Sequence, residues 1–484
     1  MKRSIPYHLL LAGLYFAIAL MGILHHELWL DEAQHWLLAR DSSSLAELFR
    51  NTRHEGHPLL WSSLLFVIAR FTVDPFGMQL VHVLIATTAA IVFLRKAPFN
   101  SIFKTLFVFG YFFVFEYSLI SRNYMLGVLF LFMACATYRQ KEKLPLLVLF
   151  LVLAANTHLI FAVPAMAFVG LLFWEQRYEQ RYQKKAFHLS IAVFIVGLLP
   201  VAAQIISTDA AWFFEPQKHI PIAEKCTKGL ISVFNGVLVL PDFRSIHFWN
   251  THFLIAVSKP FSAVLGLCCY ALPLLLLRSR KILFFAYLAF FGIQLFFFIT
   301  QRSGARFDGI TYLILIMALW LDHDSESTQK VSKTYAKPVI YGILTLQLAS
   351  GIIAYAIDWN HPFTGGKAAV AYLRSYRLDR LPVVSPTCDG TIISAYLGKK
   401  VWFLCPQSQQ SFCPWDSACG QEMSQQLVLA QLNDYLQTHA DFIYISNYKL
   451  SPTPVDGMNI QFIENFKKNI LNNTDYYIFR ISKS

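Results

Sequence analysis

Long apolar segments recur along this chain and limit what it can fold into. Hydrophobic residues make up 56% of its 484 residues and charged residues 14%, against about 25% charged residues in ordinary soluble domains. A chain this apolar cannot hide its surface in one soluble core, and a helix of about 20 apolar residues crosses the hydrocarbon core of a membrane. The sequence therefore predicts an α-helical polytopic membrane protein.

About eleven segments are candidate transmembrane helices. They lie at residues 6–24, 77–94, 101–117, 123–138, 144–157, 159–174, 187–207, 255–277, 282–300, 309–321 and 338–357. The first follows a basic N-terminus, as in a signal peptide, but no small-residue cleavage site ends it. We therefore expect it to be retained as a span.

Short basic clusters between these segments set the expected orientation. With the N-terminus in the cytoplasm, clusters such as Arg95–Lys96 and Lys184–Lys185 all face the cytoplasm, as the positive-inside rule requires. No nucleic-acid-binding motif accompanies them, so the net charge of +12 does not indicate a nucleic-acid partner. We expect a multi-pass protein of the plasma (inner) membrane.

One segment of the first outer loop, residues 25–76, tests this orientation. Residues 57–71 are apolar, but as a helix they rise only about 22 Å, and a crossing there would put the later basic clusters outside. We therefore expect an amphipathic helix in the membrane interface, a depth that suits Trp61 and Arg70. The stretch 31–40 is expected to lie in the interface too.

The composition changes after about residue 358. Apolar runs shorten to strand length and alternate with helical patterns, which indicates a small α/β domain at 358–484, outside the cytoplasm, after a transmembrane domain at 1–357. Strands are expected at 383–385, 401–404, 442–446 and 476–481, and helices at 366–377 and 421–438.

Four of the eight cysteines fall in this C-terminal domain, namely Cys388, Cys405, Cys413 and Cys419. Disulfides form outside the cytoplasm, so these cysteines are candidates for disulfide bonds. Their spacing does not match a zinc motif, and it leaves the pairing open.

Ionisable and polar residues gather on the expected outer side, and such residues beside membrane spans are functional candidates. They are Asp31, Glu32, His35, Glu55 and His57 in the first loop, Glu116, Arg122, Asn123 and Tyr124 around the next outer turn, His158 in the turn after it, and Arg302 and Arg306 in the last outer loop. Loops distant in sequence thus deliver polar groups to one side of the membrane. A site at a membrane surface would be built in this way.

Each candidate has a structural and a functional interpretation. Asp31 and Glu32 could simply occupy the first turn of a helix, where the macrodipole favours acids, or a desolvated Asp31 could act as a general base. In a helix His35 would share the face of Asp31 and could orient it. Arginines such as Arg122 and Arg302 either snorkel to lipid headgroups or bind a phosphate.

The stretch His54–Pro58 invites a metal interpretation. It differs from the H-E-x-x-H zinc motif in its spacing. Two histidines three positions apart with a glycine between them also make poor joint ligands. We expect instead that Gly56 and Pro58 turn the chain into the following helix.

Three short motifs resemble a known family. Leu30–Ala33, just after the first span, resembles the first outer loop of GT-C fold glycosyltransferases. Gly56–Leu60 is similar to the turn that follows in those using dolichyl- or undecaprenyl-phosphate sugars, such as the protein O-mannosyltransferase and aminoarabinose transferase relatives, although Leu59 replaces a second proline. Ser121–Tyr124 looks like their outer turn after the third span. The resemblance covers the plan of residues 1–320 and leaves the C-terminal domain unmatched.

The resemblance implies transfer of a sugar, with inversion, from a polyprenyl-phosphate donor to an acceptor hydroxyl or amine. Asp31 would be the general base, and Glu32 would support it or bind a divalent cation such as Mg²⁺ or Mn²⁺. Arg122, with Arg302 or Arg306, would stabilise the leaving phosphate. The acceptor would be a lipid, a polysaccharide of the cell envelope or a protein.

Two other classes of protein remain as alternatives. A transporter or flippase of a lipid-linked or polar solute usually has internal repeats and broken spans with polar groups at the midplane. Here the strong charges lie at one rim and no repeat is visible. A non-catalytic scaffold that presents the C-terminal domain fits the dense first loop poorly, so we favour an enzyme.

Overall fold

The computed structural model describes residues 6–53, 55–206, 220–302, 304–325, 336–414, 419, 423–451 and 457–484. The chain splits into two compact units. The first comprises Met1–Gly22, Gly56–Trp61 and Val81–Ala356, and the second comprises Ile23–Glu55, Ser62–Leu80 and Ile357–Ser484. The C-terminal residues thus cluster with most of the first outer loop. His54, part of the weighed metal motif, lies outside the described residues.

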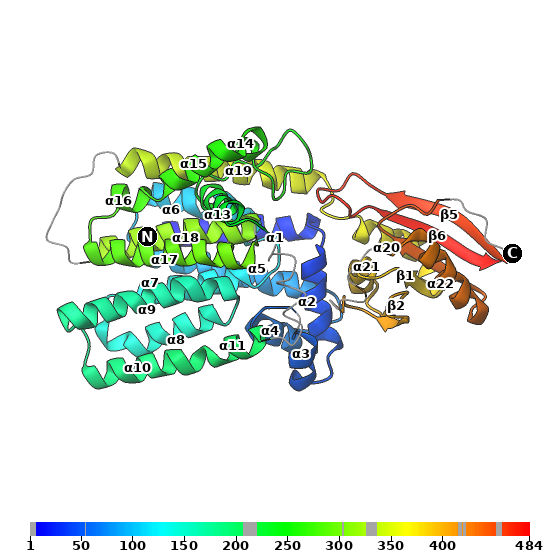
Figure 1. Ribbon diagram of the computed structural model, residues 1–484, viewed down its shortest axis with the longest axis horizontal. Helices are drawn as coiled ribbons and strands as arrows, with labels where there is room; N and C mark the ends of the chain where they lie inside the picture. Colours follow the sequence, from blue (N-terminus) through cyan, green and yellow to red (C-terminus); the bar gives the residue numbers. More distant parts are fainter. Residues whose placement is uncertain are drawn as a thin grey trace, which may run out of the picture. The chain divides into compact units, whose positions relative to one another are not determined.

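The first unit is helical (Figure 1). Its helices are α6 (Ser101–Val108), α7 (Tyr124–Thr137), α8 (Leu144–Ala155), α9 (Leu159–Glu179), α10 (Lys184–Gly197), α11 (Leu199–Ile205), α13 (Ile222–Val237), α14 (Phe253–Val257), α15 (Lys259–Cys269), α16 (Leu272–Leu276), α17 (Arg280–Thr300) and α18 (Ala305–Asp324). The boundary between the units falls within four further helices, α1 (Tyr7–His25), α4 (Leu60–Ile68), α5 (Phe76–Lys96) and α19 (Ala336–Asn360).

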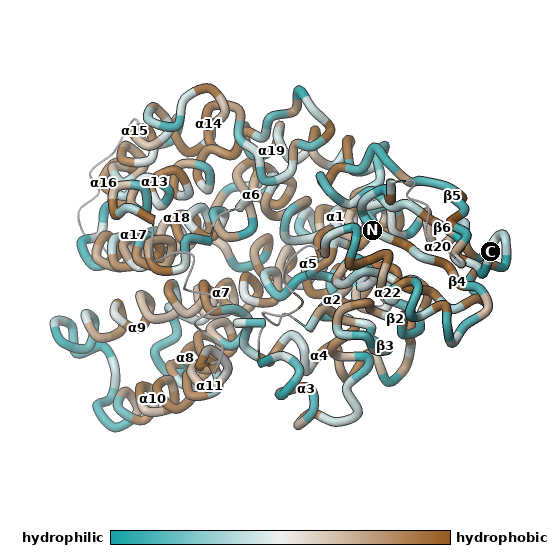
Figure 2. The backbone as a smooth tube through the Cα atoms, turned by 45° about the vertical axis from the view of Figure 1, so that its right-hand side comes forward, coloured by the Kyte–Doolittle hydropathy of each residue, from teal (hydrophilic) through white to brown (hydrophobic). Residues whose placement is uncertain are grey.

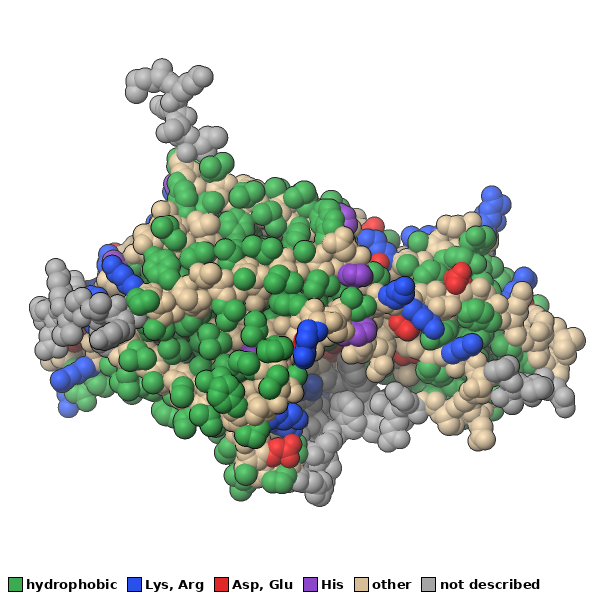
Figure 3. Space-filling model, turned by 90° about the horizontal axis from the view of Figure 1, so that it is seen from above, with side chains coloured by type: hydrophobic (Ala, Val, Ile, Leu, Met, Phe, Trp, Pro, Cys, Tyr) green, Lys and Arg blue, Asp and Glu red, His purple; other side chains and the backbone are tan. Residues whose placement is uncertain are grey.

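Within the described residues, six helical segments are long and apolar enough to cross a membrane, namely α1, α5, α9, Lys184–Ala203, α17 and α19. Apolar residues run along these helices (Figure 2), and large side chains such as Ile195, Phe291 and Ile352 are exposed. Hydrophobic side chains also cover much of the visible surface of the helical unit (Figure 3). So much exposed apolar surface requires lipid around it. The expected integral membrane protein is confirmed.

The eleven expected spans are all largely helical where the structure describes them, but three are interrupted. One of them, 187–207, is interrupted only at Leu198, between α10 and α11. In the expected span 101–117, α6 ends at Val108 and a π-helical turn follows at Phe112–Glu116. The expected span 255–277 consists of the short helices α14, α15 and α16, of which the last two begin with Pro260 and Pro273 near their first positions. Proline suits a first helical turn but interrupts a continuing helix. The number of spans therefore stays a prediction.

A helix that the sequence did not suggest, α13, lies in the region expected to be an outer loop. It packs against α15, α17 and α18. Gly236 makes the approach to α18 possible, because a Cβ atom there would lie 2.0 Å from the Asp308 carbonyl oxygen. The carbonyl of Val239, just after the helix, accepts a hydrogen bond from the Ser350 hydroxyl at 2.9 Å. The polar residues of α13 concealed this helix in the sequence.

A buried charge cluster joins the ends of α7, α9 and α17 that carry basic residues. The Glu175 carboxylate is fully buried and accepts hydrogen bonds from the Tyr138 and Tyr182 hydroxyls. It also pairs with Arg181 at 2.5 Å and with Lys281 at 2.8 Å. A carboxylate removed from water needs such partners, and removing one member of a buried pair strands the other charge.

We expect Glu175→Gln to lower the stability of the first unit by roughly 3 kcal/mol, because two largely buried cations lose their shared counter-charge. The midpoint of thermal unfolding in detergent measures this. Glu179→Gln is the matched control, since Glu179 pairs with the same Lys281 but is 42% exposed, and its loss should cost under about 1 kcal/mol. Equal effects of the two substitutions would contradict the prediction.

The second unit combines helices with one mixed sheet. Its helices are α2 (Leu30–Asp41), α3 (Leu45–Asn51), α20 (Gly366–Ser375), α21 (Gly390–Leu397) and α22 (Gln425–Thr438), and its strands are β1 (Val383–Ser385), β2 (Val401–Phe403), β3 (Ser408–Gln410), β4 (Asp441–Ser446), β5 (Met458–Phe466) and β6 (Tyr476–Lys483). The strand order is β3-β2-β1-β4-β6-β5. β1 is parallel to β2 and β4, and the other pairs are antiparallel.

The combination of a helical part with a small sheet domain is as expected, and all four expected strands are present. Three elements were missed. β3 consists of polar residues, β5 is a half-exposed edge strand, and α21 lies between two expected strands. Pairing to a neighbouring strand makes the first two into strands, and single-strand patterns do not reveal such pairing.

Alternate sheet residues face opposite layers of helices. Val384 and Phe442 belong to a core with Leu432 and Leu436 of α22. On the other face, α21 approaches closely at Gly390, where a Cβ atom would lie 2.5 Å from the Phe403 ring and 2.8 Å from Ser385 Cβ. α21 in turn packs against α2. The first-loop helix thereby becomes part of the sheet domain.

This packing corrects one expectation. The stretch 31–40 was expected to lie in the membrane interface, but every residue of α2 from Glu32 to Ala39 is buried in protein. A helix enclosed in this way has no apolar face left for lipid. α4, by contrast, leaves Val67 55% exposed, and its interfacial placement stays a prediction.

The four cysteines of the C-terminal region form two disulfides, which pair Cys388 with Cys413 and Cys405 with Cys419. The sequence had left this pairing open. Both bonds lie within the second unit and close loops beside the sheet. Disulfides persist in oxidising compartments, which supports the expected location of this domain outside the cytoplasm.

Candidate functional site

Asp31 and Glu32 lie in the first turn of α2. The Glu32 side chain turns back and accepts the Trp29 backbone N–H at 2.9 Å, which caps the start of the helix. Carboxylates are also favoured at this position by the helix dipole. The structural interpretation therefore holds for Glu32, which is fully buried, whereas Asp31 is only half-buried.

Glu32 also contacts a histidine that the sequence analysis did not single out. His26 Nε2 lies 3.4 Å from Glu32 Oε2, and His26 Nδ1 lies 2.9 Å from Asp358 Oδ2. Burial disfavours the charged imidazole, but Asp358 and Glu32 outweigh it and raise the pKa of His26 to about 10. A buried imidazolium between two carboxylates thus links the start of α2 to the end of α19.

The backbone between His26 and α2 has further anchors in the C-terminal region. The Leu28 N–H donates to the Tyr396 hydroxyl at 2.7 Å, and the Leu28 carbonyl accepts from the Thr364 hydroxyl at 3.0 Å. The segment that leads into Asp31 is therefore held on both its polar backbone groups.

Gln34 anchors the next turn of α2. Its amide donates to the Cys413 carbonyl at 2.8 Å and accepts the Cys413 N–H at 2.7 Å. The same amide nitrogen donates to Glu55 at 2.8 Å. Because Cys413 is bonded to Cys388, a disulfide of the C-terminal region supports the helix that carries Asp31.

The remaining first-loop candidate of this unit, His35, is buried. Its Nδ1 lies 3.5 Å from the Ser62 hydroxyl, so it contacts the first turn of α4. One helical turn separates it from Asp31. Its expected role in orienting Asp31 stays a prediction.

In the first unit, four residues from three loops far apart in sequence meet. Arg122 Nη2 lies 3.3 Å from His57 Nε2, and the His57 and His158 rings are 4.5 Å apart. The Tyr124 hydroxyl lies 3.2 Å from His158 Nε2. Four of the residues picked from the sequence therefore form one cluster.

The protonation state of His158 follows from its hydrogen bonds. Its Nδ1 accepts the Ile160 backbone N–H at 3.0 Å and caps the start of α9. That nitrogen therefore carries no proton, and in the neutral ring Nε2 carries the proton and donates to Tyr124.

Positive charges around His158 keep it neutral. Burial lowers its pKa well below the usual value, and the charges of His57, Arg122, Arg306 and Arg302 lower it further. The two arginines of the last outer loop thus act on the same imidazole as Arg122. We call these five residues, with Tyr124, the cationic cluster.

The loop between α17 and α18 is held in a defined conformation. The Ala305 N–H donates to Asn250 Oδ1 at 2.9 Å, after Gly304 with a φ of +125°. The Arg306 guanidinium carbon lies 4.8 Å from the Phe307 ring centre and 5.8 Å from that of Trp249. Arg302 remains exposed. The two arginines are therefore placed by the start of α18.

Two other candidates have structural contacts. Glu116 Oε2 accepts from the Trp249 indole at 3.0 Å and from the Tyr111 hydroxyl at 3.2 Å. The Asn123 amide donates to the Thr157 carbonyl at 2.7 Å, which joins the turn before α7 to the turn before α9. Both residues help to hold the loops that form the cationic cluster.

The candidates thus divide between the units. Asp31, Glu32, His35 and Glu55 belong to the second unit, and His57, Glu116, Arg122, Asn123, Tyr124, His158, Arg302 and Arg306 belong to the first.

Four residues near the start of α2 and the end of α19 were not among the residues expected from the sequence, namely His26, Glu27, Gln34 and Asp358. A signal was present, because His26 and Glu27 directly follow the first span and Asp358 follows the last expected span. Ionisable residues at such positions are functional candidates. Burial raises the pKa of Glu27 to about 7 despite the nearby Lys367.

The described residues do not form a ready-made metal site. No three of their histidine, cysteine, aspartate and glutamate side chains are grouped to hold an ion. The Glu32 carboxylate, the weighed ligand for Mg²⁺ or Mn²⁺, is occupied by His26 and by the Trp29 N–H. Its donor set suits a structural role better than metal binding.

No protein-family model matches the sequence, and no curated protein matches it. Among solved structures, the chain is similar to the crystal structure of ArnT from Cupriavidus metallidurans bound to undecaprenyl phosphate, with a TM-score of 0.49 and 12% identity over 97% of each chain. At this level of similarity the match adds no evidence about the substrate or the role of any residue.

We expect His26 to stabilise the second unit in a pH-dependent manner. Its pKa rises from 6.5 to about 10 in the folded chain, so its contribution is complete below pH 6.5 and is lost as the pH rises through about 10. The difference in thermal midpoint between wild type and His26→Gln should therefore shrink over that interval.

The matched control is His361→Gln, three residues after Asp358 in the same unit. It should show no such pH-dependent difference from wild type. A constant difference for His26→Gln across the interval would mean that the imidazole is not charged between its carboxylates.

Proposed function

We propose that this chain is a membrane glycosyltransferase that moves a sugar from a polyprenyl-phosphate donor to an acceptor at the outer face of the membrane. The cationic cluster carries the proposal. It brings three arginines from two loops around one neutral histidine. Guanidinium groups bind phosphate through paired, charge-assisted hydrogen bonds.

In this proposal the cluster binds the donor phosphate. When the bond between the sugar C1 and the phosphate oxygen breaks, negative charge grows on the departing polyprenyl phosphate. Arg122, with Arg302 or Arg306, stabilises that charge, which is the usual task of fixed positive groups in catalysis. The hydrogen bond between His158 Nε2 and the Tyr124 hydroxyl holds the cluster together.

Asp31 is the proposed general base. It takes the proton from the acceptor hydroxyl or amine while the acceptor atom attacks C1 on the side opposite the phosphate, which inverts the anomeric centre. Its support comes from its position, half-buried in the first turn of a helix that is anchored by Glu32, His26 and Gln34. A general base accelerates proton transfer most when it is held rigidly against the group that it deprotonates.

Glu32 supports Asp31 in this proposal instead of binding a cation. The expected orientation is retained, with the N-terminus in the cytoplasm of a cell with a plasma (inner) membrane and the C-terminal domain outside. The acceptor in this proposal is a lipid, a polysaccharide or a protein.

We expect the wild type in lipid nanodiscs to release or transfer label from one member of a panel of radiolabelled polyprenyl-phosphate sugars. Asp31→Asn should lower the transfer rate by roughly 10²- to 10⁴-fold, because the general base is lost, and should still bind the donor. Asp41→Asn, at the other end of α2, is the matched control and should remain active. Full activity of Asp31→Asn would contradict the assigned base.

We expect Arg122→Gln to weaken donor binding by roughly 10- to 100-fold, the value of a charge-assisted hydrogen bond to phosphate. Arg122→Lys, which keeps the charge, should recover part of the loss. Arg244→Gln serves as the control, because Arg244 is an exposed arginine of the same unit paired with Asp242. Binding is measured with labelled donor in nanodiscs, after the thermal midpoint has shown that each variant is folded.

The assay also separates the alternative functions. Movement of intact donor across a proteoliposome membrane without cleavage would identify a transporter or flippase instead. A failure of every polyprenyl-phosphate sugar to bind would reject the glycosyltransferase proposal.

A further inference from the structure

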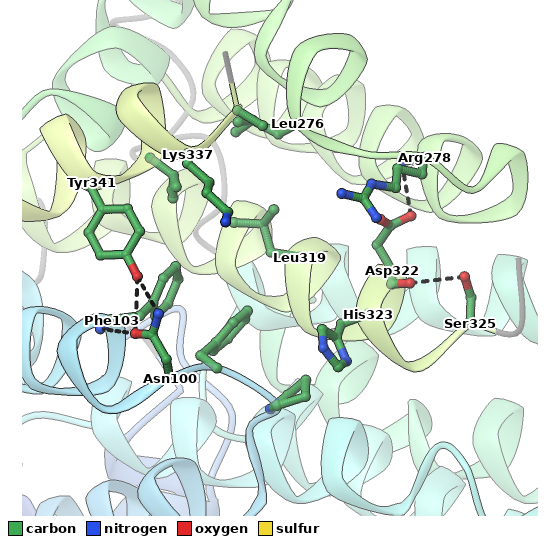
Figure 4. Close-up of a pocket in the computed structure, with 14 residues that line it drawn as sticks. Asn100, Phe103, Leu276, Arg278, Leu319, Asp322, His323, Ser325, Lys337 and Tyr341 are labelled. Carbon is green, nitrogen blue, oxygen red and sulfur yellow. Dashed lines mark hydrogen bonds between the residues drawn. The ribbon is translucent and has the colours of Figure 1, made fainter. Parts of the chain in front are cut away.

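A second polar site lies in the first unit, at the end of α18 opposite the cationic cluster. It is a cavity of about 530 Å³ between the end of α18 and the beginnings of α6 and α19 (Figure 4). α18 begins at Ala305, beside Arg306, and its 20 residues end at Asp324, a rise of about 30 Å. That length separates the two sites by about the thickness of the hydrocarbon core.

The polar lining of this cavity is predominantly basic. Arg278, Lys337 and His323 contribute to it, and all three are exposed. The one acidic residue of the lining, Asp322, is engaged with the backbone, because it accepts the N–H groups of Arg278 and Ser279 at 3.1 and 2.7 Å. It holds the segment that leads into α17, and its single negative charge leaves the two cations Arg278 and Lys337 in excess.

Neutral hydrogen-bonding groups and apolar walls complete the lining. Figure 4 shows the Tyr341 hydroxyl and the Asn100 amide facing each other, at 2.8 Å. Phe103, Leu276 and Ile340 supply apolar surface. Cationic, hydrogen-bonding and apolar groups are therefore combined at the level where several membrane helices begin or end.

We propose that this cavity binds the headgroup of an anionic phospholipid. Arg278 and Lys337 would contact the phosphate, Tyr341 and Asn100 the polar part of the headgroup, and Phe103, Leu276 and Ile340 the start of the acyl chains. Basic pockets between membrane helices on the cytoplasmic side bind such lipids, and the basic clusters of this chain indicate that this end faces the cytoplasm. Soluble phosphate compounds share the charge but lack the chains that the apolar wall would accommodate.

The test uses delipidated full-length protein in detergent, titrated with phosphatidylglycerol or phosphatidylcholine and followed by native mass spectrometry. Wild type should bind phosphatidylglycerol in preference to phosphatidylcholine. The double variant Arg278→Gln/Lys337→Gln should bind phosphatidylglycerol roughly thirtyfold more weakly, as expected for the loss of two surface cations. Its thermal midpoint without lipid shows whether it is folded.

The matched control is Lys184→Gln/Lys185→Gln, which removes the same charge from exposed positions of the same unit outside the cavity. It should retain the affinity of the wild type. An equal loss in this control, equal binding of phosphatidylcholine, or displacement of the lipid by inorganic phosphate would each overturn the proposal. If the double variant Arg278→Gln/Lys337→Gln fails to fold, the single variant Lys337→Gln, at an exposed position, provides the same comparison with Lys184→Gln.

Discussion

Charge removed from water must be balanced by charge or hydrogen bonds close by, and much of this protein depends on that constraint. Glu175 meets it with two cations and two phenols inside the helical unit. His26 meets it with Glu32 and Asp358 in the second unit. Each group joins segments distant in sequence, because only a folded chain brings the compensating partners together.

The cationic cluster uses the opposite arrangement. Several positive groups surround one buried histidine, whose pKa is thereby lowered well below its usual value. Such a concentration of positive charge suits a strongly anionic ligand, and a phosphate fits the geometry of guanidinium groups best. The helix α2, which carries Asp31, has no such concentration of charge. Contacts with Tyr396 and Cys413 fix its backbone and leave Asp31 itself half-buried.

The two proposed ligands belong to the same physical class, because both are phosphates carried on long apolar chains. A membrane protein meets such amphiphiles at the depth where its helices end, and arginine and lysine reach that depth most easily. The cationic cluster adds tight packing and hydrogen-bonded histidines, which suits a reacting group. The cavity at the far end of α18 is more open and has exposed cations, which suits a resident lipid.

The sequence by itself determined the membrane class, the positions of most helices and four of the six strands, because hydropathy and periodicity are local properties. It could indicate that Arg122, His158 and Arg306 lie on one side of the membrane, but not that both arginines act on His158. Only the tertiary structure decided the pairing of the cysteines, the burial of α2, the presence of α13 and the engagement of Glu32 by His26 and Trp29. Each of these depends on contacts between residues far apart in the chain, and no local pattern of side chains encodes such contacts.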